Sequence, residues 1–464
     1  MEKRSRRLPK TTIYLIIALV LSTTFFWEVS GLGEDLPTAQ NLDQKVGEYL
    51  QAHLNLNQFS GSVLLARDGQ ILFEESYGMA DLELQVKNDP DTRYLLGSVS
   101  KQFTAAGILL LQAEGNLEVS EPISTYIPDY PQGDTITIQQ LLTHSSGIPN
   151  YTQFEDFPTL MRTPTDPRGL VDTISEHKLD FDPGEKVAYS NSNYVLLGYI
   201  IEQVTGTSYD KFMESEVFQP LGMTKSGYAH NRPLIKKRAE GYSISGGELV
   251  NAPYIHMSIP YAAGALYSTV GDLHRWIQAL SGQEFLDQKL KDKMFNPHQG
   301  GFVYGWIIDE LFDYRRISHA GAINGFKAAV NWFPDEKLEI IILSNYEHAP
   351  IGEISRDLAA IALDRNYELP EKKEVIQLAP ELMKRYTGTY KAGEEIQFEV
   401  TFDQGLYVQV PGQPKLQIYP QSETVFFPRE INAEIEFLLN EKGEATALIF
   451  SQTGKSFEAE KVEG

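Results

Sequence analysis

The sequence contains no cysteine among its 464 residues. This absence excludes disulfide bonds, thiolate zinc sites, cysteine nucleophiles and lipid attachment at an N-terminal cysteine. Basic residues are few relative to acidic ones, since 40 Lys and Arg stand against 63 Asp and Glu, a net charge of −23. That balance argues against nucleic acid or another anionic surface as a general partner. Catalytic chemistry therefore has to come from Ser, Lys, Tyr, His or carboxylate side chains.

Two common hydrolase signatures are also missing. No Gly-x-Ser-x-Gly occurs, which argues against an α/β-hydrolase, and no His-Glu-x-x-His occurs, which argues against a zincin. We expect neither a metal nor a cofactor. With 42% apolar and 22% charged residues, the chain has the composition of a globular protein and is long enough for two or three domains.

Residues 1–31 have the composition of an export segment. Basic residues precede an apolar run at positions 11–27, an order typical of a signal peptide or a signal anchor. The run is at the short limit for crossing a bilayer, and a weak small-residue cleavage site ends at Gly31. A secreted chain and a chain anchored in the membrane through this segment both remain open. Either outcome predicts that the rest of the chain is extracytoplasmic.

The spacing of apolar residues divides the remaining chain into three parts. Over 38–365, helical patterns alternate with β-rich runs joined by short connections, which predicts an antiparallel sheet flanked by helices, with a mainly helical insertion: an α+β fold. The main β-rich runs are expected at 302–308, 314–319, 326–333 and 338–343. A linker is expected at 366–380, and short alternating runs over 381–464 predict a small all-β, barrel-like domain.

The stretch from Tyr94 to Thr104 carries the first chemical motif. It turns at Gly97 into a helix, which places Ser98 at the helix N-terminus and Lys101 on the same face. Burial and the positive end of the helix dipole would lower the pKa of the lysine, so that its amine could accept a proton from the serine. Free N–H groups at the start of the helix could stabilise an oxyanion.

By itself the Ser-x-x-Lys pattern is weakly specific. It occurs three times, at Ser98 and also at Ser175 and Ser208. An N-cap serine followed by a solvated lysine is the favoured explanation of an isolated copy. Only partners elsewhere in the sequence can favour one copy over the others.

Two further polar segments favour the copy at Ser98. Tyr-Ser-Asn at 189–191 is expected where a short strand meets a helix, and His-Ala-Gly-Ala at 319–322 is expected where a strand ends. Strand ends that open into one cleft are where catalytic groups gather. Taken singly, the tyrosine could belong to the core, the asparagine could cap a helix, and the histidine could be a hydrogen-bonded strand-end residue.

In this order, Ser-x-x-Lys, Tyr-x-Asn and His-x-Gly, the sequence resembles the serine β-lactamase superfamily over roughly residues 40–365. It is most similar to the class C-like branch, which includes D,D-carboxypeptidases, D-aminopeptidases and esterases. The resemblance implies that Ser98 is the acylated nucleophile, Lys101 its proton partner and Tyr189 a base. We expect a cationic Lys101 to lower the pKa of Tyr189, so that the two groups titrate together.

The resemblance also implies substrate-binding positions and an appended domain. Asn191 would hold a substrate amide and Lys101, and the backbone N–H groups of Ser98 and Ala322 would form an oxyanion hole. Gly321 would allow the chain to approach closely. The C-terminal β domain would be a lipocalin-like appendage.

One position departs from the lactamase pattern. His319-Ala320 stands where lactamases usually have a lysine and then a threonine or serine, so a permanent charge for a substrate carboxylate is replaced by a mostly neutral imidazole. Histidine-first versions occur among the esterase and peptidase members, which favours those activities. His144, in a Leu-Leu-Thr-His-Ser-Ser-Gly turn, is expected to be structural.

Together these observations predict an exported serine hydrolase that cleaves an ester or an amide through an acyl-enzyme on Ser98. The substrate would be a small molecule or a peptide, with cell-wall material as one source. A penicillin-binding-type D,D-peptidase or a β-lactamase is an alternative within the same class. A catalytically silent binding or sensor module on the same fold is the alternative from another class.

Overall fold

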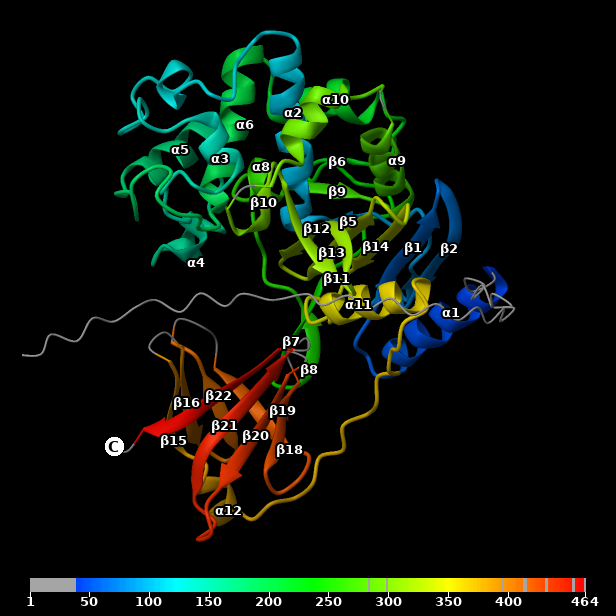
Figure 1. The fold of residues 1–464 in the computed structure, drawn as a ribbon, viewed down its shortest axis with the longest axis vertical. Helices are drawn as coiled ribbons and strands as arrows, with labels where there is room; N and C mark the ends of the chain where they lie inside the picture. The colour runs from blue at the N-terminus through cyan, green and yellow to red at the C-terminus, as the bar shows by residue number, and fades with distance from the viewer. Residues whose placement is uncertain are drawn as a thin grey trace, which may run out of the picture. The chain divides into compact units, whose positions relative to one another are not determined.

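The computed structural model describes residues 39–462, apart from positions 283, 298, 394–395, 412–414, 430–432 and 453–454. Figure 1 shows the elements of a mixed helical and β part, which ends with helix α11, and of a β-barrel that follows it. The predicted signal or anchor segment, 1–31, lies outside the described residues. Among the residues that are described, no helix is both long and apolar enough to cross a membrane.

A seven-stranded antiparallel sheet forms the centre of the first part. Its strand order is β10-β11-β12-β13-β14-β1-β2, so the first hairpin of the chain pairs with the last strand of this part. The strands are β1 (Gly61–Arg67), β2 (Gln70–Tyr77), β10 (Phe302–Val303), β11 (Trp306–Leu311), β12 (Tyr314–Ile323), β13 (Phe326–Phe333) and β14 (Leu338–Ser344). The predicted β-rich runs at 326–333 and 338–343 are confirmed, and β12 continues beyond His319 to Ile323. The single run predicted at 302–308 is wrong, because the chain turns there and forms two paired strands, β10 and β11.

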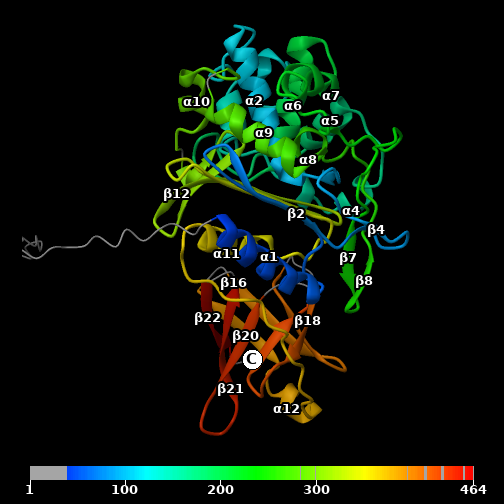
Figure 2. The same cartoon turned by 90° about the vertical axis from the view of Figure 1, so that its right-hand side faces the viewer.

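Helices α1 (Ala39–Asn55) and α11 (Ile351–Ala362) cover one face of this sheet, as Figure 2 shows. Strand β14 is buried on both faces, and its side chains alternate between two hydrophobic clusters. Ile340 and Ile342 pack with α1 and α11, whereas Ile341 and Leu343 belong to the cluster of the opposite face. Because both of its faces are covered, the sequence of β14 is an almost continuous run of apolar residues.

The mainly helical insertion packs on the opposite face. Helix α2 lies at its centre, and every residue from Ser100 to Leu109 is buried. The helices are α2 (Ser100–Ala113), α3 (Ile138–Leu142), α4 (Phe157–Leu160), α5 (Pro167–Ser175), α6 (Asn191–Thr205), α7 (Tyr209–Phe212), α8 (Tyr261–Gly264), α9 (Val270–Ser281) and α10 (Gln288–Met294). The structure therefore confirms the predicted α+β fold.

Short elements connect these layers. The 3-10 turns are η1 (Gly97–Val99), η2 (Ile123–Thr125), η3 (Tyr151–Gln153) and η5 (Gln299–Gly301), and η4 (Met213–Phe218) is a π-helix. The small sheets are formed by β5 (Tyr94–Leu95), β9 (Leu266–Ser268) and β6 (Gly227–Tyr228), by β3 (Met79–Asp81) and β4 (Val86–Lys87), and by β7 (Tyr242–Ser245) and β8 (Glu248–Asn251).

The C-terminal part is a closed antiparallel barrel, in which β15 pairs with both β16 and β22. Side chains such as Tyr390, Phe398 and Phe437 fill its core. Its elements are α12 (Pro380–Lys384), β15 (Gly388–Ala392), β16 (Ile396–Phe402), β17 (Leu406–Gln409), β18 (Leu416–Pro420), β19 (Val425–Pro428), β20 (Glu434–Leu439), β21 (Ala445–Gln452) and β22 (Lys455–Val462). The predicted all-β architecture is confirmed, while the boundaries at 366–380 stay a prediction.

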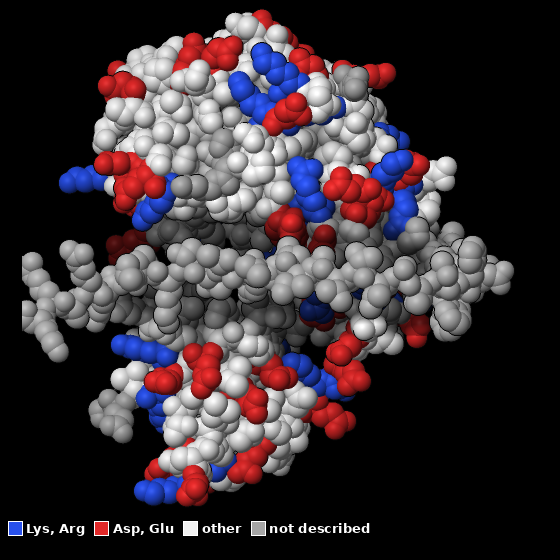
Figure 3. Space-filling view, in the orientation of Figure 1, with Lys and Arg blue, Asp and Glu red and all other residues white. Residues whose placement is uncertain are grey.

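On the face drawn in Figure 3, acidic and basic side chains of the described residues are interspersed.

Candidate active site

Ser98 lies in the turn η1, directly before helix α2 begins at Ser100. Strand β5 brings the chain to this point, and Gly97 makes the turn with a φ of +51°, a conformation that favours glycine. The serine side chain is half-buried, so its hydroxyl can be reached from outside. This agrees with the prediction that Ser98 stands at the start of a helix.

Lys101 is completely buried, and its amine is surrounded by oxygen atoms. Lys101 Nζ lies 3.0 Å from Ser98 Oγ, 2.8 Å from Asn191 Oδ1 and 2.8 Å from the Ala263 carbonyl oxygen. Burial lowers the pKa of Lys101 well below its usual value, as predicted. A neutral amine has two N–H donors, which match the two carbonyl oxygens, and one lone pair, which then faces the Ser98 hydroxyl.

Tyr189 reaches the same serine from the other side. Its hydroxyl donates to Ser98 Oγ at 2.8 Å. The predicted lowering of its pKa by Lys101 is wrong: burial raises the pKa of Tyr189 to about 12, so the phenol is protonated at neutral pH. The expected strand before Tyr189 is also wrong, because residues 186–190 have no regular secondary structure before α6 begins.

His144 holds Tyr189 in place. The two rings lie 4.5 Å apart between centroids and are inclined by 33°. The His144 Nδ1 atom accepts a hydrogen bond from the Ser190 N–H at 3.1 Å, and burial lowers the pKa of His144 well below its usual value. Its own backbone has a φ of +57°, which is uncommon for a residue other than glycine. His144, which was predicted to be structural, therefore packs against Tyr189, whose hydroxyl is hydrogen-bonded to Ser98.

Asn191 is the first residue of α6 and connects Lys101 to the loop that precedes η3. Its Oδ1 accepts from the lysine amine, while its Nδ2 donates to Asn150 Oδ1 at 3.2 Å. Asn150 Oδ1 also accepts the Asn191 backbone N–H at 3.1 Å. Asn150 and Ala263 could not be selected from the sequence, because an asparagine and a main-chain carbonyl in loops have no distinctive spacing.

Strand β12 runs directly past the serine. A Cβ atom added to Gly321 would lie 1.9 Å from the Leu96 carbonyl oxygen, and one added to Gly97 would lie 2.7 Å from the Ala322 carbonyl oxygen and 2.8 Å from the Ala322 nitrogen. Both positions therefore exclude a side chain. The main chain of Ala322 therefore lies directly against the turn that holds Ser98.

His319 lies within β12 instead of at the strand end that the sequence predicted. Strand β11 pairs with β12 only as far as Ser318, so the following residues pair with β13 alone. The ring is buried, and its Nδ1 lies 2.6 Å from the Ala320 carbonyl oxygen. Burial lowers the pKa of His319 to about 4. The imidazole is therefore neutral at pH 7.

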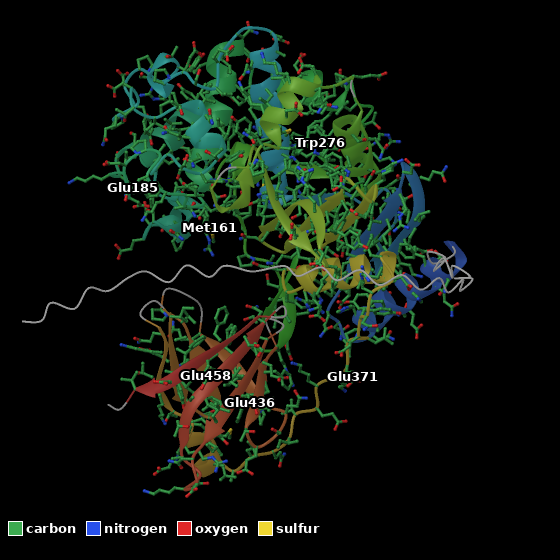
Figure 4. All side chains as sticks on the ribbon, viewed as in Figure 1. Met161, Glu185, Trp276, Glu371, Glu436 and Glu458 are labelled. Carbon is green, nitrogen blue, oxygen red and sulfur yellow. The ribbon has the colours of Figure 1, made fainter. Side chains whose placement is uncertain are left out.

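A buried aromatic group supports α2 from the side of α9. The Trp276 Nε1 atom donates to Gln102 Oε1 at 3.0 Å, and its ring packs 4.5 Å from that of Phe103. Figure 4 labels Trp276 among the side chains of this region. These contacts fix the helix turn that carries Lys101.

The structure brings together all seven residues that the sequence selected, Ser98, Lys101, Tyr189, Asn191, His319, Gly321 and Ala322, and leaves the other Ser-x-x-Lys pairs elsewhere. Lys178 and Lys211 are exposed, unlike Lys101. Among the described residues, no group of three or more His, Asp or Glu side chains is arranged to hold a metal ion.

A half-buried serine between a buried lysine amine and a tyrosine hydroxyl, on this α+β fold, defines a serine hydrolase of the β-lactamase and penicillin-binding-protein type. The family model for beta-lactamases matches residues 42–364, and the chain belongs to that family. A second model, a domain of unknown function (DUF3471), matches residues 372–464.

Several characterised or solved proteins are similar to most of this chain. Penicillin-binding protein 4* of Bacillus subtilis (strain 168) is 31% identical over 434 residues, which cover 87% of this chain and 95% of that protein. The octameric penicillin-binding protein homologue from Pyrococcus abyssi has a TM-score of 0.64 and 25% identity. The match covers 90% of this chain and 99% of the Pyrococcus chain. The D-amino acid amidase from Ochrobactrum anthropi SV3 shares the fold, with a TM-score of 0.63 at 23% identity, over 70% of this chain and 99% of its own.

Proposed function

We propose that this protein is an exported serine hydrolase that cleaves an ester or an amide through an acyl-enzyme on Ser98. The observation that carries the proposal is the position of Ser98 Oγ, 3.0 Å from Lys101 Nζ and 2.8 Å from the Tyr189 hydroxyl. One neighbour can take a proton from the serine, and the other can give a proton to a leaving group.

In the acylation step, the neutral Lys101 amine takes the hydroxyl proton as Ser98 Oγ attacks the carbonyl carbon. The oxyanion that forms is held by the N–H groups of Ser98 and Ala322. When the bond to the leaving alcohol or amine breaks, the Tyr189 hydroxyl supplies the proton that this group needs. The resulting phenolate is stabilised by the new Lys101 ammonium, whose nitrogen lies 5.1 Å from the centre of the Tyr189 ring.

Deacylation returns both protons. The Tyr189 phenolate takes a proton from a water molecule, which attacks the acyl carbon, and the Lys101 ammonium gives its proton back to Ser98 Oγ as the ester bond breaks. Tyr189 is then the base of the second half-reaction, although it is protonated in the free enzyme. His144 and Asn191 act by positioning the tyrosine and the lysine.

The neutral His319 supports a preference for substrates without a carboxylate next to the reacting carbonyl. A lysine at this place would offer a charge-assisted hydrogen bond, which an uncharged imidazole cannot match. The composition of residues 1–31, which predicts an export segment, supports an extracytoplasmic location. Small ester or amide substrates, including peptides of the cell wall, fit that location.

Penicillin-type acylation of Ser98 is the second candidate. It is favoured by the 31% identity to penicillin-binding protein 4* over nearly the whole of that protein. In this case a D,D-peptidase or β-lactamase reaction would use the same serine, lysine and tyrosine. A module that is acylated without turnover is the third outcome.

The test is labelling of the purified chain with a fluorophosphonate and with a fluorescent penicillin, followed by mass spectrometry of the labelled peptide. We expect the fluorophosphonate on Ser98, together with steady turnover of a p-nitrophenyl ester. Labelling by penicillin that persists for hours would favour a D,D-peptidase, and steady turnover of the penicillin would favour a β-lactamase. A single burst of p-nitrophenol without turnover would favour the silent module, and a label on another residue would contradict the assignment of Ser98.

A further inference from the structure

The side-chain amide of Asn191 could face the Lys101 amine with either of its two ends, which are alike in shape and opposite in hydrogen bonding. In the structure its carbonyl oxygen, Oδ1, lies 2.8 Å from Lys101 Nζ. If the amide were turned over, its NH2 group would donate to the lone pair of a neutral lysine, and that lone pair would no longer face Ser98. The orientation of this amide therefore decides whether Lys101 can accept a proton from the serine.

Asn150, in the loop between α3 and η3, fixes this orientation. Its Oδ1 accepts the backbone N–H of Asn191 at 3.1 Å and that of Thr152 at 3.5 Å. Because a backbone N–H can only donate, the carbonyl end of the Asn150 side chain has to face these two groups. The same Oδ1 accepts from Asn191 Nδ2 at 3.2 Å, whereas a reversed Asn191 amide would place two carbonyl oxygens at that distance. The Oδ1 of Asn191 therefore points at Lys101.

The segment that carries Asn150 is anchored independently of the Asn150 side chain. The Tyr151 N–H donates to Ser192 Oγ at 2.9 Å, and the Ser192 hydroxyl donates to the Pro149 carbonyl oxygen at 2.6 Å. The Tyr151 ring is buried, and its hydroxyl donates to the Ile259 carbonyl oxygen at 2.7 Å. Removal of the Asn150 amide should therefore leave this backbone in place, so that an effect on the reaction can be assigned to the side chain.

The titratable groups around the Lys101 amine are uncharged at pH 7. Lys101 Nζ lies 5.1 Å from the centre of the Tyr189 ring and 5.5 Å from that of Tyr194, and burial raises the pKa of both phenols. Burial lowers the pKa of the imidazoles of His144 and His319. Within the described part of the chain, no carboxylate pairs with the lysine amine, whose own pKa is lowered by burial. The direction of its hydrogen bonds, and not an ionic attraction, therefore holds the amine.

We propose that Asn150 is a positioning residue for the proton transfer from Ser98, a role that rests on the proposed function. By fixing the Asn191 amide, it keeps one N–H group of the lysine amine on Asn191 Oδ1. The second N–H group lies on the Ala263 carbonyl oxygen, and the lone pair is left for the Ser98 hydroxyl, 3.0 Å away. Asn150 contacts no reacting atom and acts through the alignment of Lys101.

The experiment measures, across pH, the rate at which a fluorophosphonate inactivates the full chain, because this reaction reports on the activation of Ser98. Asn150→Ala should lower the rate about tenfold or more, with an unchanged circular dichroism spectrum. Asn150→Asp keeps an oxygen for the same N–H groups and should retain most of the rate at high pH. Its negative charge favours the ammonium form of Lys101, so the acid limb of the profile should move upward by about one pH unit.

Gln153→Glu is the matched control, because it adds the same charge to an exposed side chain of the adjacent turn η3. Water screens a charge at that position, so the acid limb should coincide with that of wild type. Asn150→Ser keeps a side chain that can cap η3 but is too short to reach Asn191 Nδ2, and it should lose as much rate as Asn150→Ala. It replaces Asn150→Ala in the test if the alanine variant does not fold.

A folded Asn150→Ala or Asn150→Ser protein that is inactivated at the wild-type rate would overturn the proposal. An Asn150→Asp protein with the acid limb of wild type would overturn it as well, because a residue that only supports the fold would not move that limb. If the fluorophosphonate does not label Ser98 of wild type, the proposed function fails, and this inference fails with it. Labelled wild type with unaltered Asn150 variants refutes this inference alone.

Discussion

The Oγ atom of Ser98 has a potential proton acceptor on one side and a proton donor on the other. Ser98→Ala should therefore lower kcat/KM for a p-nitrophenyl ester by about a thousandfold or more, with an unchanged circular dichroism spectrum. Ser175→Ala and Ser208→Ala are matched controls, because each removes the serine of a Ser-x-x-Lys pair whose lysine is exposed. A Ser98→Ala protein that is as active as wild type would refute the proposed nucleophile.

The protonation of Lys101 and Tyr189 predicts the pH dependence of the reaction. The buried Lys101 amine is neutral above its lowered pKa, so kcat/KM should fall as the pH decreases through that value. Because the pKa of Tyr189 is about 12, no alkaline loss is expected below about pH 11. Lys101→Arg, which cannot be deprotonated, should be inactive throughout. A rise in activity centred near pH 10 would instead indicate that Tyr189 acts as the base in the free enzyme.

His319 predicts which substrates are preferred. Wild type should have a higher kcat/KM for a short-chain p-nitrophenyl ester than for nitrocefin, and His319→Lys should raise nitrocefin turnover. A charge-assisted hydrogen bond to the substrate carboxylate contributes about 1.5–3 kcal/mol, or roughly 10- to 150-fold. Nitrocefin as the better substrate of wild type, or lower nitrocefin turnover by His319→Lys at every pH, would contradict this interpretation.

The sequence was sufficient to select the catalytic candidates but not their protonation. Ser98, Lys101 and Tyr189 could be found because motif order restricts the choice among three Ser-x-x-Lys pairs. The direction of the Tyr189 pKa could not be predicted, since it depends on how deeply the phenol is buried. The contact between His144 and Tyr189 could not be predicted either, because it exists only after the chain has folded.

The contact between turn η1 and strand β12 predicts the effect of one methyl group. Gly321→Ala would place a Cβ atom 1.9 Å from the Leu96 carbonyl oxygen, so the strand must move away from Ser98. We expect kcat to fall by about a hundredfold, since small displacements of catalytic groups have effects of this size. Gly47→Ala, where the nearest atom would be 3.8 Å away, should leave kcat unchanged. Equal activity of the two variants would show that the close approach is not needed.

Helices and strands were predictable where periodicity is strong. The strands β13 and β14 and most of β12 follow from alternating or continuous apolar runs. The extension of β12 to Ile323 was missed, because small residues such as Ala320, Gly321 and Ala322 have low strand propensity. Pairing with β13 decides that they form a strand.

The segment between α11 and α12 predicts how the whole chain is cleaved. Residues 365–379 form no helix or strand, and Glu368 and Glu371 are exposed there; Figure 4 labels Glu371. A glutamate-specific protease should therefore cut first within 366–380 and release a folded fragment that contains the barrel. Lys373 forms an ion pair with Glu434 at 3.5 Å, which ties the chain at this point to the barrel. Cleavage at Glu368 and Glu371, on the N-terminal side of Lys373, should therefore occur earlier than cleavage on its C-terminal side. Early cuts confined to other loops would contradict the predicted linker.

The pairing of β1 with β14 has a consequence for how the chain acquires its structure. Gly61 of β1 lies opposite Ser344 of β14. Strand β1 therefore cannot pair with β14 until nearly the whole hydrolase part has been synthesised. During synthesis the apolar face of β1 stays uncovered until then, and a contact between such distant residues forms slowly. A chain that cannot close its central sheet from its N-terminal portion remains unfolded while it is being made. Such a delay would suit the proposed export, because passage through a protein-conducting pore requires a chain that has not yet folded.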